Sequence, residues 1–170
     1  MIKKRRAFYV LVIGIVVFLS IFFFLKETYN NSFSLKPKEH YITIKDNSIN
    51  YLGYSLYWNG LIKPIIQDIS VYQNETFENR NNESIKFFID EESALVSLNE
   101  DAYKVSEQKK LVHLIDYKDF HVKSSKFSTT LVIRINTKYK SELSKIKQIR
   151  IRYKLLFFEK EQVLDISFSS

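Results

Sequence analysis

The sequence has no cysteine, three glycines, two prolines and one tryptophan among its 170 residues. Without cysteine the chain forms no disulfide and carries no lipidated-cysteine anchor. Three glycines do not make the glycine-rich loop that cradles a phosphate group. The three histidines, His40, His113 and His121, leave few ways to pair a nucleophile with a base. These shortages disfavour phosphate-loop enzymes and nucleophilic enzymes.

A long apolar run, by contrast, is present at the start of the chain. Residues 7–25 are nineteen consecutive uncharged residues, and Lys3, Lys4, Arg5 and Arg6 precede them directly. At about 1.5 Å per residue, a helix of this length spans roughly 28 Å, close to the hydrocarbon thickness of a bilayer. Because lipid offers no partner to backbone N–H and C=O groups, a lone span has to be helical. The run therefore predicts one N-terminal transmembrane helix.

Two other interpretations of this run are a cleaved secretory signal and a buried core helix. A cleaved signal has a shorter apolar core and ends in a small-x-small cleavage site. The residues that follow the run, KETYNNS, offer no such site. We therefore expect an uncleaved signal anchor. The positive-inside rule then places residues 1–6 in the cytoplasm and the chain after residue 25 outside the cell.

The charge balance gives little sign of a nucleic-acid partner. The net charge is +7, but four of the 26 basic residues and none of the 19 acidic residues precede residue 26. The remainder of the chain therefore carries a net charge of +3 only. An extracytoplasmic domain without cysteine, rich in Lys, Asn, Ile, Phe and Tyr, is typical of a bacterial envelope, and its composition favours a Gram-positive source.

The residues after the run divide into a predicted linker and a predicted domain. Residues 26–39 are polar and aperiodic and contain Pro37, which indicates a short linker. Residues 40–170 then form one extracytoplasmic domain of β-strands, with turns at Asn59-Gly60, 99–102 and 159–162, a surface loop at 73–84 and a helical turn at 138–147. The predicted strands are residues 40–45, 51–58, 65–72, 85–89, 94–98, 103–105, 111–115, 131–135, 149–157 and 163–168.

Short strands at spacings of roughly 8 to 15 residues predict an all-β fold, an antiparallel immunoglobulin-like β-sandwich, with a barrel as the alternative. The order strand, Trp58-Asn59-Gly60, Lys63-Pro64, strand, with a long basic and apolar hairpin at the end, resembles the ectodomains of small single-pass immunoglobulin-like proteins of Gram-positive bacteria. The resemblance covers about 110 residues and implies the sandwich fold. It implies no activity, because such folds carry many unrelated functions.

One cluster has the residue types of a metal site. His113, Asp116, Asp119 and His121 supply two imidazoles and two carboxylates within nine residues, a set that suits zinc. Their spacing matches no known ligand motif, so we interpret them as solvated polar residues around a turn. The acidic groups at 90–92 and 100–101 are likewise interpreted as solvated turns. We therefore expect neither a metal nor another cofactor.

Two further patterns suggest contact surfaces. Arg150, Arg152 and Lys154 alternate with apolar residues, which predicts a basic stripe on the outward face of one strand, with Arg134 nearby. Such a stripe suits anionic wall polymer or lipid headgroups, although alternate charges also keep an edge strand away from other strands. The aromatic group of Tyr51, Tyr54, Tyr57 and Trp58 is interpreted as core packing rather than as an exposed contact platform.

These observations favour a binding or accessory module over an enzyme. We expect a non-enzymatic, membrane-anchored module of the bacterial cell envelope, with its N-terminus cytoplasmic and its C-terminal domain extracytoplasmic. Its expected partners are the membrane and either another envelope protein or anionic wall polymer, and not nucleic acid. The alternative is a metal-dependent envelope hydrolase that uses His113, Asp116, Asp119 and His121.

Overall fold

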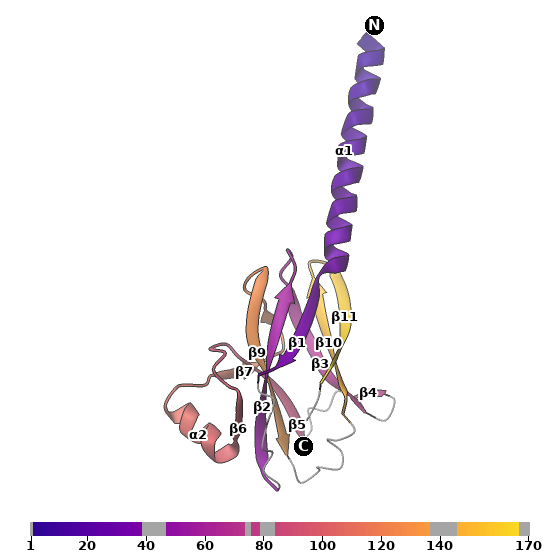
Figure 1. Cartoon of the computed structure of the whole chain (residues 1–170). Helices are drawn as coiled ribbons and strands as arrows, with labels where there is room; N and C mark the ends of the chain where they lie inside the picture. Colours follow the sequence, from indigo (N-terminus) through magenta and orange to yellow (C-terminus); the bar gives the residue numbers. More distant parts are fainter. Residues whose placement is uncertain (1, 39–46, 74–75, 79–83, 137–145, 167–170) are drawn as a thin grey trace.

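The computed structural model of the chain describes residues 2–38, 47–73, 76–78, 84–136 and 146–166. A long helix leads into two antiparallel β-sheets that pack face to face (Figure 1). The predicted all-β sandwich is therefore confirmed as an architecture of two antiparallel sheets. The predicted strand at 40–45 and most of the predicted helical turn at 138–147 lie outside the described residues.

The helix, α1, spans Ile2–Asn30 and contains the whole uncharged run. As predicted, the run is helical despite its many β-branched and aromatic residues. The described side chains of α1, which are Tyr9 and residues 11–26, are all exposed in the isolated chain. Within the residues that the structure describes, no helix combines the length and the apolar character needed to cross a membrane.

In the described part of the chain, the first sheet contains six strands in the order β1-β2-β9-β5-β7, and β6 pairs with β2 beside this path. Its centre is the long pair of β2 and β9, in register from Ile49 opposite Asn136 to Asn59 opposite Lys126. The strands are β1 (Ser32–Pro37), β2 (Ile49–Asn59), β5 (Ile85–Asp90), β6 (Ser97–Asn99), β7 (Leu114–Asp116) and β9 (Lys126–Asn136).

The second sheet contains five strands among the described residues, in the order β11-β10-β3-β4, and β8 pairs with β3. The strands are β3 (Ile65–Gln73), β4 (Thr76–Glu78), β8 (Phe120–His121), β10 (Gln148–Leu155) and β11 (Phe158–Asp165). The predicted surface loop at 73–84 was thus partly wrong, because β4 pairs with the end of β3.

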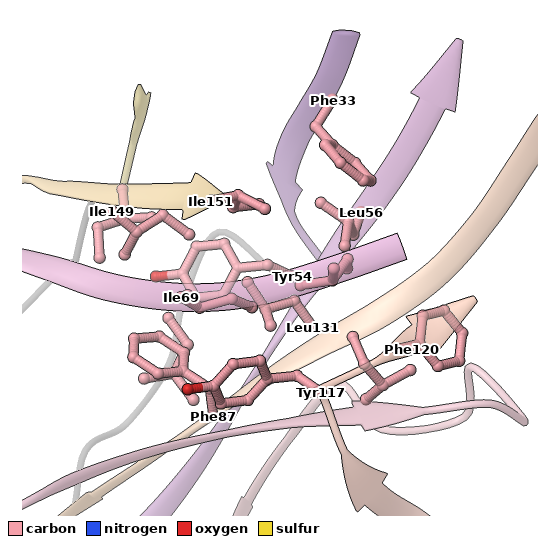
Figure 2. Packing of buried hydrophobic residues seen from close by; sticks show 14 of the residues in the cluster. Phe33, Tyr54, Leu56, Ile69, Phe87, Tyr117, Phe120, Leu131, Ile149 and Ile151 are labelled. Atoms are coloured by element: carbon pink, nitrogen blue, oxygen red, sulfur yellow. The ribbon is translucent and has the colours of Figure 1, made fainter. Parts of the chain in front are cut away.

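The core between the sheets is built from alternate residues of the long strands, as the period-two pattern predicted (Figure 2). An aromatic group lies at its α1 end, where the Phe33 ring is 4.7 Å from the Trp58 ring and 5.1 Å from the Tyr153 ring, centroid to centroid. The interpretation of the aromatic residues of β2 as core is confirmed for Tyr51, Tyr54 and Trp58, which are buried.

The outward face of the first sheet is also partly covered. Alternation along the predicted strand 131–135 points Leu131, Ile133 and Ile135 inward and Val132 toward solvent. Val132 is instead buried in a second apolar cluster with Tyr51, Leu95 and Val112. Part of this cover is helix α2 (Glu100–Gln108), whose Tyr103 ring stacks on the Tyr51 ring at 4.2 Å. The segment between β5 and β9 therefore folds back over the sheet.

The predicted turn at 99–102 and strand at 103–105 were wrong, because these residues belong to α2. Asn99 is the N-cap of the helix, and its side-chain oxygen accepts a hydrogen bond from the backbone N–H of Ala102 at 2.9 Å. Glu100 and Asp101 occupy the first turn, where negative charge interacts favourably with the helix dipole. The polar residues that predicted a turn at 99–102 are thus the N-cap and the first turn of a helix.

The predicted linker at 26–39 was also wrong. α1 continues to Asn30, and β1 begins at Ser32 and pairs with β2 along its whole length. Phe33 and Leu35 share one face of β1, and Phe33 is only 2% exposed. Burial of this face explains why a polar segment with one proline forms an edge strand, where proline is tolerated.

The last two strands form the predicted hairpin, but its turn was misplaced. Leu155 pairs with Phe158, so the two-residue turn is Leu156-Phe157. Residues 159–162, predicted as the turn, lie inside β11. Alternation along the predicted strand 149–157 places Phe157 on the core face, but Phe157 is 89% exposed.

The turn predicted at Asn59-Gly60 is not a tight hairpin, because β2 and β3 belong to different sheets. Neither residue has a positive φ. Glycine is needed at position 60 for a steric reason: a Cβ there would lie 2.5 Å from the Cγ of Asn31.

Candidate functional site

The four candidate metal ligands of the alternative interpretation are not brought together. His113 precedes β7 and Asp116 is its last residue, and β7 pairs with β5 in the first sheet. Asp119 precedes β8 and His121 is its last residue, and β8 pairs with β3 in the second sheet. All four side chains are exposed. Among the described residues, no group of three or more His, Asp or Glu could hold a metal ion. The alternative interpretation of these four residues as a ligand set is therefore not supported, because adjacent segments of chain join opposite sheets.

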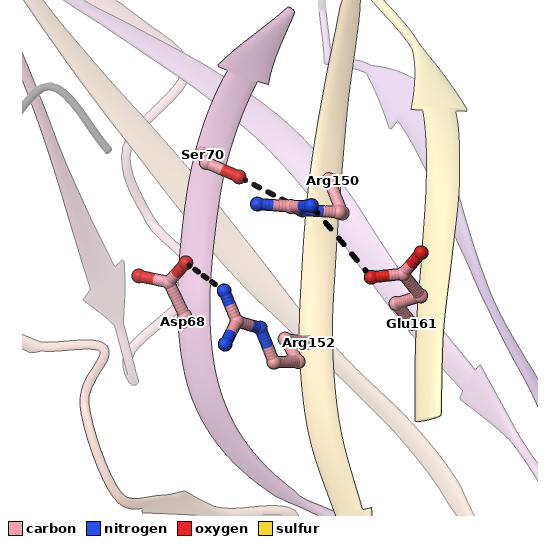
Figure 3. Close-up of polar contacts among 5 residues, drawn as sticks. All are labelled: Asp68, Ser70, Arg150, Arg152 and Glu161. Atoms are coloured by element: carbon pink, nitrogen blue, oxygen red, sulfur yellow. Dashed lines mark hydrogen bonds and ion pairs between the residues drawn. The ribbon is translucent and has the colours of Figure 1, made fainter. Parts of the chain in front are cut away.

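The predicted basic stripe lies on the outward face of β10, as the alternation indicated. The Nε of Arg150 donates to the Ser70 Oγ at 3.2 Å, and its Nη1 lies 3.7 Å from the Glu161 Oε2. The Nη2 of Arg152 lies 3.4 Å from the Asp68 Oδ2 (Figure 3). Each arginine therefore pairs with an acid on a neighbouring strand.

These acids change what the stripe can bind. Asp68 comes from β3 on one side and Glu161 from β11 on the other, and Glu159 stands opposite Lys154. An open hollow on this face is lined by Arg150, Arg152, Glu159, Lys160 and Glu161. This face therefore carries basic and acidic side chains next to one another, which suits hydrogen bonding to a polar partner better than binding of a polyanion.

Arg134 does not belong to this face. It lies on β9 in the first sheet, opposite Tyr51 on β2 and Lys86 on β5, and its side chain is half-buried. The hydrophobic core separates it from Arg150 and Arg152. Lys154 remains on the stripe as an exposed residue at the end of β10.

One carboxylate interpreted as part of a solvated turn is fully buried. The Oδ2 of Asp90 accepts from the Leu95 N–H at 2.8 Å, and its Oδ1 accepts from the His113 N–H at 3.4 Å. The Lys38 amine donates to the Ser93 carbonyl in the same loop. Burial lowers the pKa of Lys38, and the charge of Asp90 partly offsets this shift. Asp90 thus holds the loop after β5, a structural role.

The buried tyrosines are packing residues and not reactive groups. Burial raises the pKa of Tyr54 to about 12, and it also raises the pKa of Tyr153 and Tyr117. A tyrosine whose pKa is raised is a poorer base and nucleophile near neutral pH. Tyr57 is the partly exposed member of the predicted aromatic group, and the Lys36 amine lies 6.0 Å from its ring centroid.

Sequence reasoning missed a surface at the end of the sandwich nearest α1. Four large apolar side chains are exposed there, on the β2–β3 connection and on the β10–β11 hairpin: Leu61, Leu156, Phe157 and Phe158. We call this set the apolar end. Its signal in the sequence is the run LLFF at 155–158, in which alternation alone assigned Leu155 and Phe157 to the core face.

The chain matches no protein-family model, and no curated protein or solved structure is similar to it at a significant level. Its function has therefore to be inferred from its own residues and contacts.

Proposed function

We propose that this chain is a single-pass membrane protein whose β-sandwich is a non-catalytic binding or accessory module on the outer face of a bacterial cell membrane. The observation that carries the proposal is the continuity of the chain: the helix that contains the uncharged run leads through one residue, Asn31, into the first strand of the sandwich. The module is thus joined to its proposed anchor without a flexible linker.

The anchor is supported by the composition of α1. The nineteen residues at 7–25 carry no charge, and four basic residues precede them. The described side chains of this helix contact no other part of the protein closely enough to be buried. An exposed apolar surface of this extent calls for a covering environment, and a bilayer matches its length. The basic residues favour a cytoplasmic N-terminus.

The proposed mechanism is placement. A module held against the membrane meets a partner in the same membrane at a high effective concentration, so weak contacts are enough for binding. The two-sheet sandwich supports the immunoglobulin-like assignment, which remains a proposal. The partner is another envelope protein or anionic wall polymer, and the mixed-charge face around Arg150 and Arg152 favours a polar protein surface.

The topology can be tested with single cysteines, because the chain contains none. Ile2→Cys keeps all four basic residues before the run, and Asp101→Cys is an exposed position on α2. A membrane-impermeant maleimide added to intact cells should label Asp101→Cys and should label Ile2→Cys only after permeabilisation. Labelling of both variants in intact cells, or release of the chain from membranes by alkaline carbonate, would contradict the proposal.

The binding role needs a second experiment. We expect purification of the full-length protein in mild detergent to recover a stoichiometric envelope protein. A variant with residues 7–25 replaced by an unrelated transmembrane segment shows whether the partner contacts the sandwich or the helix. Arg152→Ala, which exposes Asp68, should weaken the complex if the mixed-charge face makes the contact. Absence of any co-purified protein would argue for wall polymer as the partner.

A further inference from the structure

The pairing of the strands brings two connections to the end of the sandwich where α1 enters. Ser32, the first residue of β1, stands opposite Asn59, the last residue of β2. The connection that follows ends at Ile65, which pairs with Lys154 beside the β10–β11 turn. The hairpin therefore lies at the same end as the base of α1, as Figure 1 shows.

The four apolar side chains of the apolar end are largely exposed to solvent. The exposed fractions are 69% for Leu61, 51% for Leu156, 89% for Phe157 and 49% for Phe158. These residues come from two separate segments that meet only in the fold. Exposed apolar residues that gather at one end indicate a contact surface rather than random scatter.

The turn of the hairpin departs from ordinary turn chemistry. Two-residue hairpin turns favour Asn-Gly and similar pairs, because the turn requires positive φ. Here the turn is Leu156-Phe157, and Leu156 has a φ of 53°. A leucine in this region is strained, and a phenylalanine at the tip is exposed to water. In water the strained Leu156 and the exposed Phe157 are both unfavourable, whereas at a membrane interface the exposure of the Phe157 ring becomes favourable.

Basic residues surround this apolar end. Lys63 lies on the β2–β3 connection, Lys126 stands opposite Asn59, and Lys154 lies at the base of the hairpin; all three are exposed. Glu159 stands opposite Lys154 and offsets part of this charge. Lysines beside exposed apolar residues are typical of surfaces that meet anionic lipid, because the long side chain reaches the headgroups.

The length of α1 places this end at the correct depth. Five residues of helix, 26–30, follow the uncharged run, which corresponds to about 8 Å along the helix axis. The headgroup region on one side of a bilayer is about 5 to 7 Å thick. An end of the domain that begins at Asn31 therefore lies at the outer edge of the headgroup region when residues 7–25 occupy the hydrocarbon core, so side chains that project from this end toward the bilayer can reach the headgroups.

We propose that the apolar end is a second membrane contact, in which Leu156 and Phe157 enter the interface of the bilayer that holds α1 and the lysines meet anionic headgroups. The inference rests on the proposed function, because it requires α1 to lie in the membrane. Its consequence is a fixed orientation: two points of attachment hold the sandwich upright, and the opposite end, with β6 and α2, faces away from the membrane.

The contact can be measured with an environment-sensitive dye on single cysteines. The full-length Phe157→Cys variant, labelled with a nitrobenzoxadiazole dye, is reconstituted into vesicles of phosphatidylcholine with or without phosphatidylglycerol. Asp101→Cys is the matched control at the far end, because Asn99 pairs with Asn50 at the start of β2. The nine residue steps from Asn50 to Asn59 along β2 separate the two ends by roughly 30 Å. We expect a blue shift and quenching by headgroup-level doxyl lipid at position 157 and neither at position 101.

Phosphatidylglycerol should increase both the blue shift and the quenching at position 157. Replacing Lys126 and Lys154 by glutamine should shift the equilibrium of the labelled tip away from the interface by about fivefold per lysine, the factor expected for one basic residue near an anionic surface. Phe157 is exposed, so the labelled variant should keep the unfolding midpoint of the parent chain.

The outcomes separate the two proposals. If the protein floats with the vesicles but positions 157 and 101 are quenched equally, the membrane contact is wrong and the anchor stands. If the chain does not float with the vesicles, the proposed function fails and the contact fails with it. Equal quenching at position 157 with and without phosphatidylglycerol would overturn the role of the lysines.

Discussion

Gly53 occupies the middle of β2, where the loop after β5 crosses the outward face of the first sheet. Its N–H donates to the Val96 carbonyl at 2.7 Å. A Cβ at this position would lie 2.5 Å from the Leu95 carbonyl oxygen and 2.6 Å from that of Val96. Because these are backbone atoms of the loop, there is little room for adjustment, so the side chain of even alanine does not fit.

We therefore predict that Gly53→Ala lowers the free energy of unfolding by about 2 to 3 kcal/mol, the range for forced overpacking. Gly14→Ala is the matched control, because nothing lies within 4 Å of a Cβ at position 14. Urea unfolding of the full-length protein in detergent micelles measures both variants. Equal midpoints for Gly53→Ala and the parent chain would show that the loop does not approach β2 this closely.

Tyr54 makes the stability of the sandwich sensitive to alkaline pH. Burial raises its pKa to about 12, from an unfolded value of about 10. The folded state therefore holds the phenolic proton more tightly than the unfolded state does. This contribution is fully present below pH 10 and is lost as the pH rises toward 12, which amounts to about 3 kcal/mol.

The expected result is a free energy of unfolding that falls between pH 10 and pH 12 in the parent chain and falls less steeply in Tyr54→Phe. The comparison uses the slope against pH, because the substitution also changes the packing at every pH. Tyr57→Phe, at a partly exposed position, is the control. An unchanged slope in Tyr54→Phe would assign the alkaline loss to Tyr103, Tyr117 and Tyr153, whose pKa values burial also raises.

At the scale of the elements, one glutamine joins an edge of the first sheet to an edge of the second. The Phe33 N–H of β1 donates to the Gln162 Oε1 at 2.7 Å, and the Gln162 Nε2 donates to the Phe33 carbonyl at 2.6 Å. β11 thus supplies with a side chain the pair of hydrogen bonds that a neighbouring strand would supply with its backbone. The side of the sandwich beside α1 is closed in this way.

Gln162→Ala should therefore lower the free energy of unfolding by about 1 to 3 kcal/mol, because it leaves a partly buried N–H and C=O of Phe33 without these partners. Gln148→Ala serves as the control: its Nε2 donates to the Asp165 Oδ1 at 2.9 Å on the exposed surface, so its loss should cost at most about 0.5 kcal/mol. Equal costs for the two variants would argue against closure by Gln162. Hydrogen exchange at Phe33 reports the same contact directly.

Local sequence patterns predicted some of the elements and missed others. The strands at 51–58, 65–72 and 85–89 were predicted close to their observed bounds, because alternation is a local consequence of one buried face. The strand predicted at 131–135 covers only the second half of β9. α2 was missed because its nine residues include few apolar ones, and because Asn99, Glu100 and Asp101 at its start are also typical of a turn. The hairpin turn was misplaced because Leu156-Phe157 has none of the residues that normally mark a turn.

At the scale of the whole molecule, β1 joins the helix to the sandwich and belongs to the sandwich. The Phe33 side chain is only 2% exposed and contacts the rings of Trp58 and Tyr153. Removing it with its strand deletes a large core residue, which typically costs about 3 to 5 kcal/mol. A domain of this size has a total stability of about 5 to 15 kcal/mol, so this loss is a large fraction of it.

We predict that a fragment of residues 31–170 folds, whereas a fragment of residues 38–170 does not keep a cooperative unfolding transition. Circular dichroism and urea unfolding distinguish the two fragments. The fragment 31–170 with Phe33→Leu, which keeps β1 and an apolar residue at that position, is the control and should have an intermediate midpoint. Cooperative unfolding of fragment 38–170 with the midpoint of fragment 31–170 would show that β1 is a linker after all.

The sequence by itself determined the helical run, the all-β class, the positions of β2, β3, β5 and β10 and the core face of β2, because each depends on residues close together in the chain. Only the tertiary structure decided which strands are neighbours. It sent β7 and β8 to opposite sheets and so separated His113 from His121, and it placed acids from β3 and β11 beside Arg150 and Arg152. It also brought Leu61 and Phe157 to one end of the sandwich. Pairing between distant segments depends on the packing of the whole core, and no local pattern records it.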